Sequence, residues 1–210
     1  SRRRRRRVTR RGTMTDDPDS RCEVSHRPIV SVRLAYRPWR AVLPDARMLL
    51  ERTARATLAA AARAGAVPIG AALEVSFMLA NDARVRRLNR DYRGQDKPTN
   101  VLSFPSENDE RDGESLGSTD GETGPRLLGD VVFALETLER EAAAQSKTLS
   151  DHLCHLAVHG VLHLLGYDHQ DAEEAECMER LEVEVLASLG IGDPYREAPV
   201  HAAALDGATP

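Results

Sequence analysis

Three histidines in the C-terminal half constrain this chain most, because their spacing lets one metal ion bind all of them: His159, His163 and His169. On a helix, residues four apart lie on one face, about 40° apart around the axis and about 6 Å along it. His159 and His163 can therefore share an ion. A continuous helix would place His169 about 120° from His163 and about 9 Å further along, out of reach. The helix must therefore end between them.

Gly166 marks the expected end of that helix. Glycine readily adopts the left-handed conformation that terminates helices, so the chain can turn back and deliver His169 as a third ligand. Three neutral imidazoles at about 2.0–2.1 Å leave the fourth tetrahedral position of zinc to water, as in catalytic zinc sites. The alternative is that His159 and His163 are packed histidines on a buried helix. We predict one Zn²⁺ ion at the end of a helix and the following loop.

The residue after the first histidine separates this chain from a well-known class of peptidases. Metzincin peptidases share the spacing H-x-x-x-H-x-x-G-x-x-H, and in them that residue is a glutamate that acts as general base. Here it is Gly160, which cannot accept a proton. A metallopeptidase would therefore need a carboxylate from elsewhere in the chain.

Residues 159–169 resemble the HGxLHLxGYDH signature of the YbeY family, which are zinc-dependent bacterial endoribonucleases. Residues 92–105, YRGQDKPTNVLSFP, are similar to the family's YRxxDxPTxVLSFP stretch, and residues 128–132 form a third match. The resemblance covers about residues 82–190 in the family's order. It implies a single-strand-specific endoribonuclease in rRNA processing, including 3′ end maturation of the small-subunit rRNA, and in ribosome quality control. The implied partners are rRNA and the small ribosomal subunit, with no DNA and no membrane.

The resemblance also implies a catalytic role for Arg93, because the arginine of YRxxD lies beside the metal cleft and is needed for activity in the family. A guanidinium can hold a phosphate through two parallel hydrogen bonds and stabilise charge on its oxygens. Without the neighbouring motif, Arg93 would be an ordinary arginine at a helix end. If it faces the metal, Arg86 and Arg90 lie at helical spacing beside it and could follow an RNA backbone. A solvated helix face explains these two equally well.

The expected chemistry is metal-assisted hydrolysis of RNA phosphodiester bonds, with Arg93 stabilising the transition state. The motif does not identify the proton acceptor, and the nucleophile could be a metal-activated water or the RNA 2′-hydroxyl. Asp168 could orient a ligand histidine, and Asp130 is a more distant candidate. We interpret His152 and His155 as packing or surface residues. The main rival is a zinc-stabilised ribosome assembly or RNA-binding factor that does not cleave RNA.

Charge and cysteine content limit the class of protein. The net charge is −4, but residues 1–13 hold eight arginines and no acid, which leaves 21 basic and 33 acidic residues in the remainder. The acidic charge of this remainder argues against non-specific binding along nucleic acid. The three cysteines form no C-x-x-C pair, so neither a disulfide framework nor a thiolate zinc site is expected. With no apolar leader or membrane segment, these features predict a cytoplasmic protein.

Hydrophobic periodicity predicts an α+β fold, a four-stranded mixed sheet packed with about five helices, as the family resemblance also implies. The expected strands are residues 29–35, 73–79, 101–104 and 127–135. The expected helices are residues 45–64, 82–92, a stretch ending at 144, 149–165 with Ser150 as cap, and 171–189 with a surface of ordinary glutamates.

Residues 26–195 are expected to form a single domain, within which residues 106–124 form a mobile acidic loop. Residues 196–210 are a predicted disordered tail, and residues 1–25 a disordered arginine-rich extension. This extension is either a nucleic-acid arm or an upstream segment ahead of Met14.

Overall fold

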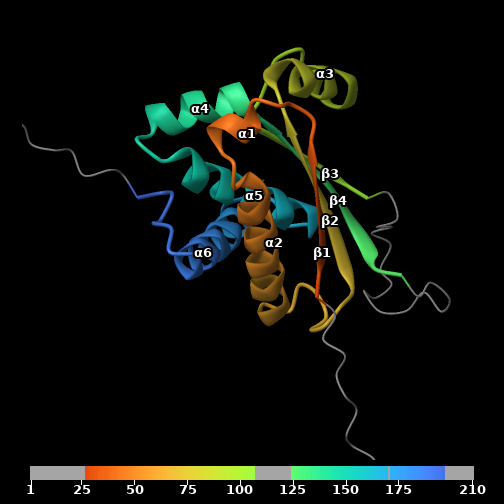
Figure 1. Ribbon diagram of the computed structural model, residues 1–210. Coiled ribbons are helices and arrows are strands. Elements are labelled where there is room, and N and C mark those ends of the chain that lie inside the picture. The colour runs from red at the N-terminus through yellow and green to blue at the C-terminus, as the bar shows by residue number, and fades with distance from the viewer. Residues whose placement is uncertain (1–26, 107–123, 170, 197–210) are drawn as a thin grey trace, which may run out of the picture.

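The computed structural model describes residues 27–106, 124–169 and 171–196 (Figure 1). The predicted arginine-rich extension, acidic loop and C-terminal tail therefore lie almost entirely outside the described residues. Among the described residues, no helix is long and apolar enough to cross a membrane. Helices α2, α5 and α6 lie to one side of a four-stranded sheet (Figure 1).

The sheet is mixed, as predicted, with the strand order β1-β2-β4-β3. Its strands are β1 (Ile29–Leu34), β2 (Leu73–Ala80), β3 (Val101–Pro105) and β4 (Arg126–Ala134). The pairs β1/β2 and β2/β4 are parallel, whereas β3 and β4 are antiparallel. Strand β3 is therefore an edge of the sheet.

The five predicted helices are present, together with a sixth, short helix that was not predicted. The helices are α1 (Trp39–Val42), α2 (Ala46–Arg63), α3 (Asp82–Arg93), α4 (Leu135–Ala144), α5 (Leu149–Leu164) and α6 (Ala172–Ser188). Helix α1 has only four residues, too few for a periodic pattern. It is held by Trp39, which is fully buried and donates its indole N–H to the carbonyl of Ala80 at 2.8 Å.

The predicted cap of α5 was wrong by two residues. Thr148 has extended backbone angles, and its hydroxyl accepts from the amide of Asp151 at 3.0 Å, which is the geometry of an N-cap. Ser150 already lies in the first turn, where its hydroxyl bonds the Thr148 hydroxyl at 2.8 Å. Both residue types cap helices well, so the local sequence did not distinguish them.

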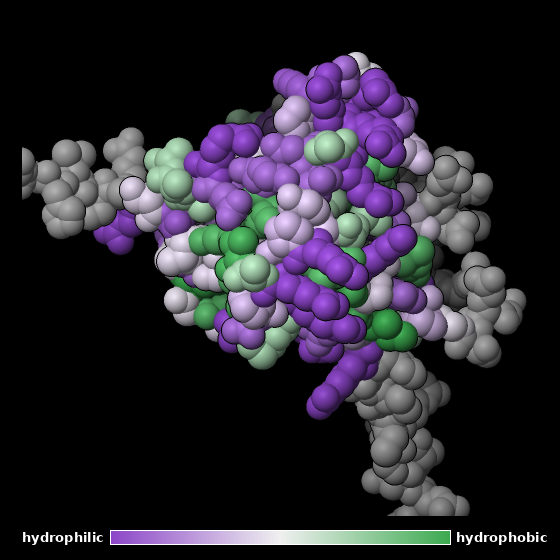
Figure 2. All heavy atoms as spheres, turned by 45° about the horizontal axis from the view of Figure 1, so that its top comes forward, coloured by the Kyte–Doolittle hydropathy of each residue, from purple (hydrophilic) through white to green (hydrophobic). Residues whose placement is uncertain are grey.

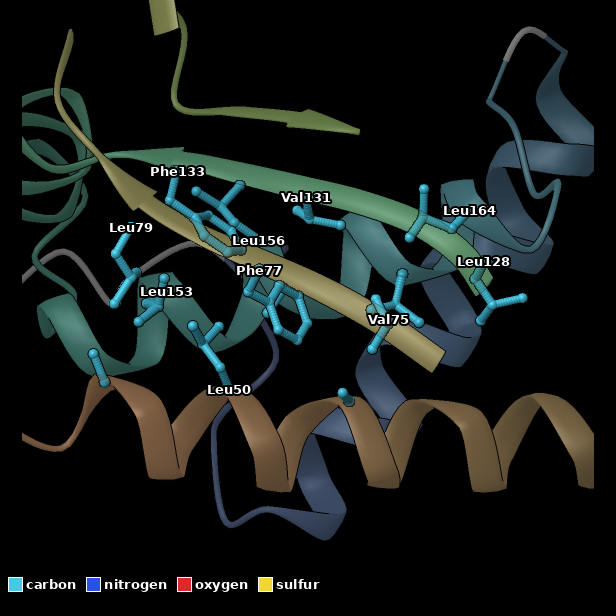
Figure 3. Close-up of a cluster of buried hydrophobic side chains, with 14 of the residues drawn as sticks. Leu50, Val75, Phe77, Leu79, Leu128, Val131, Phe133, Leu153, Leu156 and Leu164 are labelled. Carbon is cyan, nitrogen blue, oxygen red and sulfur yellow. The ribbon is translucent and has the colours of Figure 1, made fainter. Parts of the chain in front are cut away.

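Helix α5 is enclosed by the core on two sides. Leu153 and Leu156 of α5 pack with Leu50 of α2 against the sheet, where Phe77 and Phe133 stack with ring centroids 5.9 Å apart (Figure 3). The other side of α5 contacts a second buried cluster with residues from α6. Few positions of α5 therefore reach solvent.

Helix α5 approaches the sheet most closely at Gly160. A Cβ atom there would lie 2.7 Å from Cγ1 of Val131, closer than real Cβ contacts allow. The Ser103 hydroxyl of β3 also donates to the Gly160 carbonyl at 3.3 Å. The position that carries the glutamate base in metzincins is thus filled here by the sheet itself.

We expect Gly160→Ala to destabilise the protein, although alanine favours helices more than glycine does. Overpacking typically costs about 1–3 kcal/mol, which outweighs the gain of up to about 1 kcal/mol in helix propensity. Denaturant unfolding would measure the difference. Gly192→Ala is the control, because nothing lies within 4 Å of a Cβ at that position. A Gly160→Ala protein as stable as the wild type would contradict this packing.

Candidate metal centre

The structure brings His159, His163 and His169 together. His159 and His163 lie on the last turns of α5, which ends at Leu164. Gly166 then adopts the left-handed conformation with φ 88°, and its amide bonds the His163 carbonyl at 3.0 Å. The chain turns back, and one ring nitrogen from each histidine lies within 4.8 Å of the others. This cluster could hold a metal ion.

Hydrogen bonds fix which ring nitrogens of His159 and His163 face the cluster. Nδ1 of His159 is 2.8 Å from a carboxylate oxygen of Glu182, and Nδ1 of His163 is 2.9 Å from the carbonyl of Tyr167. Both partners are acceptors, so both Nδ1 atoms donate. In the neutral rings, each Nε2 atom then carries a lone pair.

These two Nε2 atoms face each other at 3.1 Å. Two lone pairs at this distance repel unless a cation lies against both. Ligands of a tetrahedral zinc ion with bonds of about 2.0–2.1 Å lie about 3.3 Å apart, close to the observed separation. Burial, followed by the charges of His159 and His169, lowers the pKa of His163, which favours the neutral imidazole that binds metals. The donor set therefore fits a metal ion.

Glu182 of α6 is fully buried and holds His159 in this orientation. Its carboxylate accepts from His159 Nδ1 at 2.8 Å, from His155 Nε2 at 3.0 Å and from the Tyr195 hydroxyl. Burial alone would raise the pKa of Glu182, but the hydrogen bonds from His155, His159 and Tyr195 outweigh it and lower the pKa to about 2. Glu182 is thus an ionised acceptor inside the protein.

The prediction that the α6 glutamates are ordinary surface residues was wrong for Glu182. The buried face of α6 includes Met178, Leu181 and Val185. Glu182 is four residues after Met178, so it falls within this same stripe. A glutamate at an inward position of an amphipathic helix was the available signal, and its histidine partners lie on another helix.

Two further histidines of α5 are hydrogen-bonded. His155 is partly buried and contacts Glu182, whereas His152 is 2% exposed and contacts Glu141 at 2.9 Å. Burial lowers the pKa of His152. Glu141 also accepts from the Asn100 side chain at 2.9 Å, and Asn100 lines the pocket around the three histidines.

An open pocket of about 770 Å³ surrounds the three histidines. Residues of β3 and its approach form one wall, including Asn100, Ser103 and Pro105. The turn after α5 and the first turn of α6 form another wall, which contributes two carboxylates, Asp168 and Glu174. Glu174 was not singled out from the sequence, where it is one of many acidic residues in α6.

Arg93 lies on the wall of this pocket. It is the last residue of α3, and its Nη2 donates to the carbonyl of Ser103 at 3.2 Å. Arg86 instead forms two hydrogen bonds of 2.8 Å with Asp96. Arg90 contacts Asp91 at 2.9 Å. These two arginines are therefore locally neutralised, which weakens the idea that they follow an RNA backbone.

The two aspartates considered from the sequence differ in their placement. Asp168 lines the pocket, and its carboxylate accepts from the His169 amide at 2.8 Å, so it shapes the turn that delivers His169. Asp130 is exposed on β4 and lies opposite Phe104 of β3. Paired residues share a face of the sheet, and Phe104 belongs to the cluster under α3. Asp130 is therefore on the face turned away from α5.

We expect Glu182→Gln to lower the free energy of unfolding of metal-free protein by about 1–3 kcal/mol, because glutamine cannot accept from all three donors. Glu184→Gln is the matched control, since Glu184 is half exposed and pairs with Arg63 at 2.7 Å. Chemical denaturation in the presence of a chelator would measure both.

The effect of Glu182→Gln should also depend on pH. Because folding lowers the pKa of Glu182 from 4.5 to about 2, its contribution is present above pH 4.5 and is lost as the pH falls toward 2. The stability difference between wild type and variant should shrink over that range. A difference that stays constant throughout would contradict the ionised, buried carboxylate.

Comparison with known proteins identifies the family. Residues 45–190 match the family model described as endoribonuclease YbeY. The chain is 51% identical over 162 residues to endoribonuclease YbeY of Rhodospirillum rubrum, covering 77% of this chain and 78% of that protein. It is 50% identical over 169 residues to the Paramagnetospirillum magneticum protein of the same name, covering 80% and 96% of the two chains. The histidine cluster, the arginine beside it and these similarities lead to one conclusion: the chain belongs to the endoribonuclease YbeY family.

Proposed function

We propose that this protein is a metal-dependent endoribonuclease in which His159, His163 and His169 bind one zinc ion. The observation that carries the metal site is the pair of Nε2 atoms facing each other at 3.1 Å while both Nδ1 atoms are engaged. Imidazole ligands suit zinc, although they also bind other transition metals. When bound, zinc would supply a Lewis acid that activates water or polarises a phosphoryl oxygen.

The proposed substrate is the phosphodiester backbone of single-stranded RNA. Residues 26–195 form the single domain that carries this activity. Membership in the endoribonuclease YbeY family supports RNA cleavage. By the same resemblance, the proposed role is rRNA processing, including 3′ end maturation of the small-subunit rRNA, and ribosome quality control. The small ribosomal subunit is the proposed partner and the cytoplasm the proposed location.

Arg93 binds the scissile region through its guanidinium group. One of its five N–H donors contacts Ser103, which orients the group at the pocket wall and leaves other donors for a phosphate. Such donors are most effective where negative charge develops in the transition state. The proposed role of Arg93 is therefore to stabilise the charge on the phosphate oxygens.

The pocket also limits which residue can accept the proton of the nucleophile. Gly160 offers no base, and the contact with Val131 leaves no room for one. Glu182 is enclosed and already accepts three hydrogen bonds. Among the described residues, the carboxylates that line the pocket are Asp168 and Glu174, and both can receive a proton from a water molecule or a ribose hydroxyl.

Cleavage of a structured rRNA precursor by metal-loaded protein tests the function. We expect Arg93→Ala to remain folded and metal-bound but to lower kcat by about 100-fold or more, the usual cost of losing a transition-state donor. Arg40→Ala is the control, because it removes an equal charge from an exposed position outside the pocket. Wild type, free of contaminating ribonuclease, that binds RNA or ribosomes without cleavage would favour the assembly factor instead.

Removal of the metal gives an independent test. We expect one zinc ion per wild-type chain, loss of stoichiometric binding in His163→Ala, and a lower melting temperature after chelation. Glu182→Gln should weaken zinc affinity by about 10- to 100-fold, because it no longer fixes the His159 tautomer. Chelator competition would measure the affinities, with Glu184→Gln as control. Unchanged zinc binding in His163→Ala would refute the site.

A further inference from the structure

Tyr92 is an exposed aromatic residue directly beside the pocket. It precedes Arg93 in the last turn of α3, and 72% of its surface is exposed. The surface over α3 is otherwise strongly hydrophilic, as the top of the molecule shows in Figure 2. Exposed arginines, including Arg84 and Arg87, account for much of this character. An open aromatic ring among positive charges is a combination that single-stranded nucleic acid recognises.

The helical position of Tyr92 explains its exposure. Val85 and Leu88 belong to the same face of α3, at positions i and i+3, and Tyr92 is at i+7. Val85 is fully buried and Leu88 partly buried in the cluster between α3 and the sheet. The apolar stripe thus continues beyond the part of α3 that the sheet covers, and its last ring reaches solvent.

A contact with Phe104 orders the Tyr92 ring. The two ring centroids are 5.2 Å apart and the planes are inclined by 65°. Phe104 is itself partly buried against the core cluster under α3. A ring restrained in this way loses little conformational freedom when a ligand stacks on it, so more of the stacking energy is available for binding.

Strand β3 lies between this ring and the pocket around the three histidines. Successive residues of a strand point to opposite faces, so Ser103 faces α5, where its hydroxyl bonds Gly160, while Phe104 faces α3. Arg93 of α3 reaches this strand and donates a hydrogen bond to the Ser103 carbonyl at 3.2 Å. In the described part of the chain no strand lies beyond β3, so none separates the two sides. A chain that passes over this edge would contact Arg93 and then Tyr92.

We propose that Tyr92 forms a nucleobase subsite, on which an unpaired base of the RNA stacks while Arg93 holds a neighbouring phosphate. This inference rests on the proposed RNA-cleaving function and adds a recognition element to it. Stacking uses the flat face of a base, which is accessible in a single strand and covered in a duplex. The subsite therefore selects unpaired RNA, with little preference for the identity of the base.

Steady-state cleavage of short single-stranded RNA by metal-loaded, full-length protein tests the subsite. We expect Tyr92→Ala to raise KM by about tenfold, the usual scale of one lost stacking contact, while kcat changes less than about twofold. Tyr92→Phe should behave like wild type, because stacking requires the ring and not the hydroxyl. Ile69→Ala is the control, since Ile69 is 82% exposed and lies outside the pocket.

Substrates with a single abasic nucleotide, moved stepwise along the RNA, locate the partner base. At one position, the abasic nucleotide should raise the KM of wild type about as much as the Tyr92→Ala substitution does with intact RNA. The same abasic substrate should not raise the KM of Tyr92→Ala further. Additive losses at every position would overturn the subsite, as would an unchanged KM in Tyr92→Ala. Normal cleavage of oligonucleotides combined with a defect only on ribosomes would also overturn it, making Tyr92 a protein contact. Wild type that does not cleave RNA would overturn the RNA-cleaving function itself.

Discussion

The close contact between α5 and the sheet determines how the rest of the site is built. At Gly160 the helix lies so near Val131 that no side chain fits between them. The remaining surface of α5 packs largely on α2 and α6. A helix enclosed in this way exposes only a narrow stripe, which carries His159 and His163. Because protein interiors are densely packed, side chains at such positions have few rotamers available. The two imidazoles are therefore held in place by the fold.

The buried carboxylate of Glu182 shows how stability and chemistry depend on the same groups. Removing a charge from water costs several kcal/mol unless hydrogen bonds replace its hydration. Here His155, His159 and Tyr195 provide those hydrogen bonds. The same bonds set the tautomer of His159 and so direct its Nε2 atom toward the histidine cluster. Helix α6 and the segment after it thus belong to the site, although they contribute none of the three clustered histidines.

The pocket combines segments that are far apart in the chain. The end of α3 provides Arg93, the edge strand β3 provides a wall, and the turn after α5 provides His169. Among the described strands, β3 lies at the edge of the sheet beside this pocket. The histidine spacing alone is compatible with a peptidase, whereas the family match of residues 45–190 identifies an endoribonuclease. The ligand spacing alone therefore does not identify the reaction.

The sequence by itself determined the features that depend on neighbouring residues. The i, i+4 histidines and Gly166 predicted the cluster, and hydrophobic periodicity predicted four strands and five helices, because both patterns are governed by local backbone geometry. Only the tertiary structure decided that Glu182 is buried while Glu184 is half exposed. It also decided that Arg86 pairs with Asp96. The histidine partners of Glu182 are 23 and 27 residues away on another helix, so no local pattern specifies their contact. Burial of a charge depends on which groups the fold brings to it.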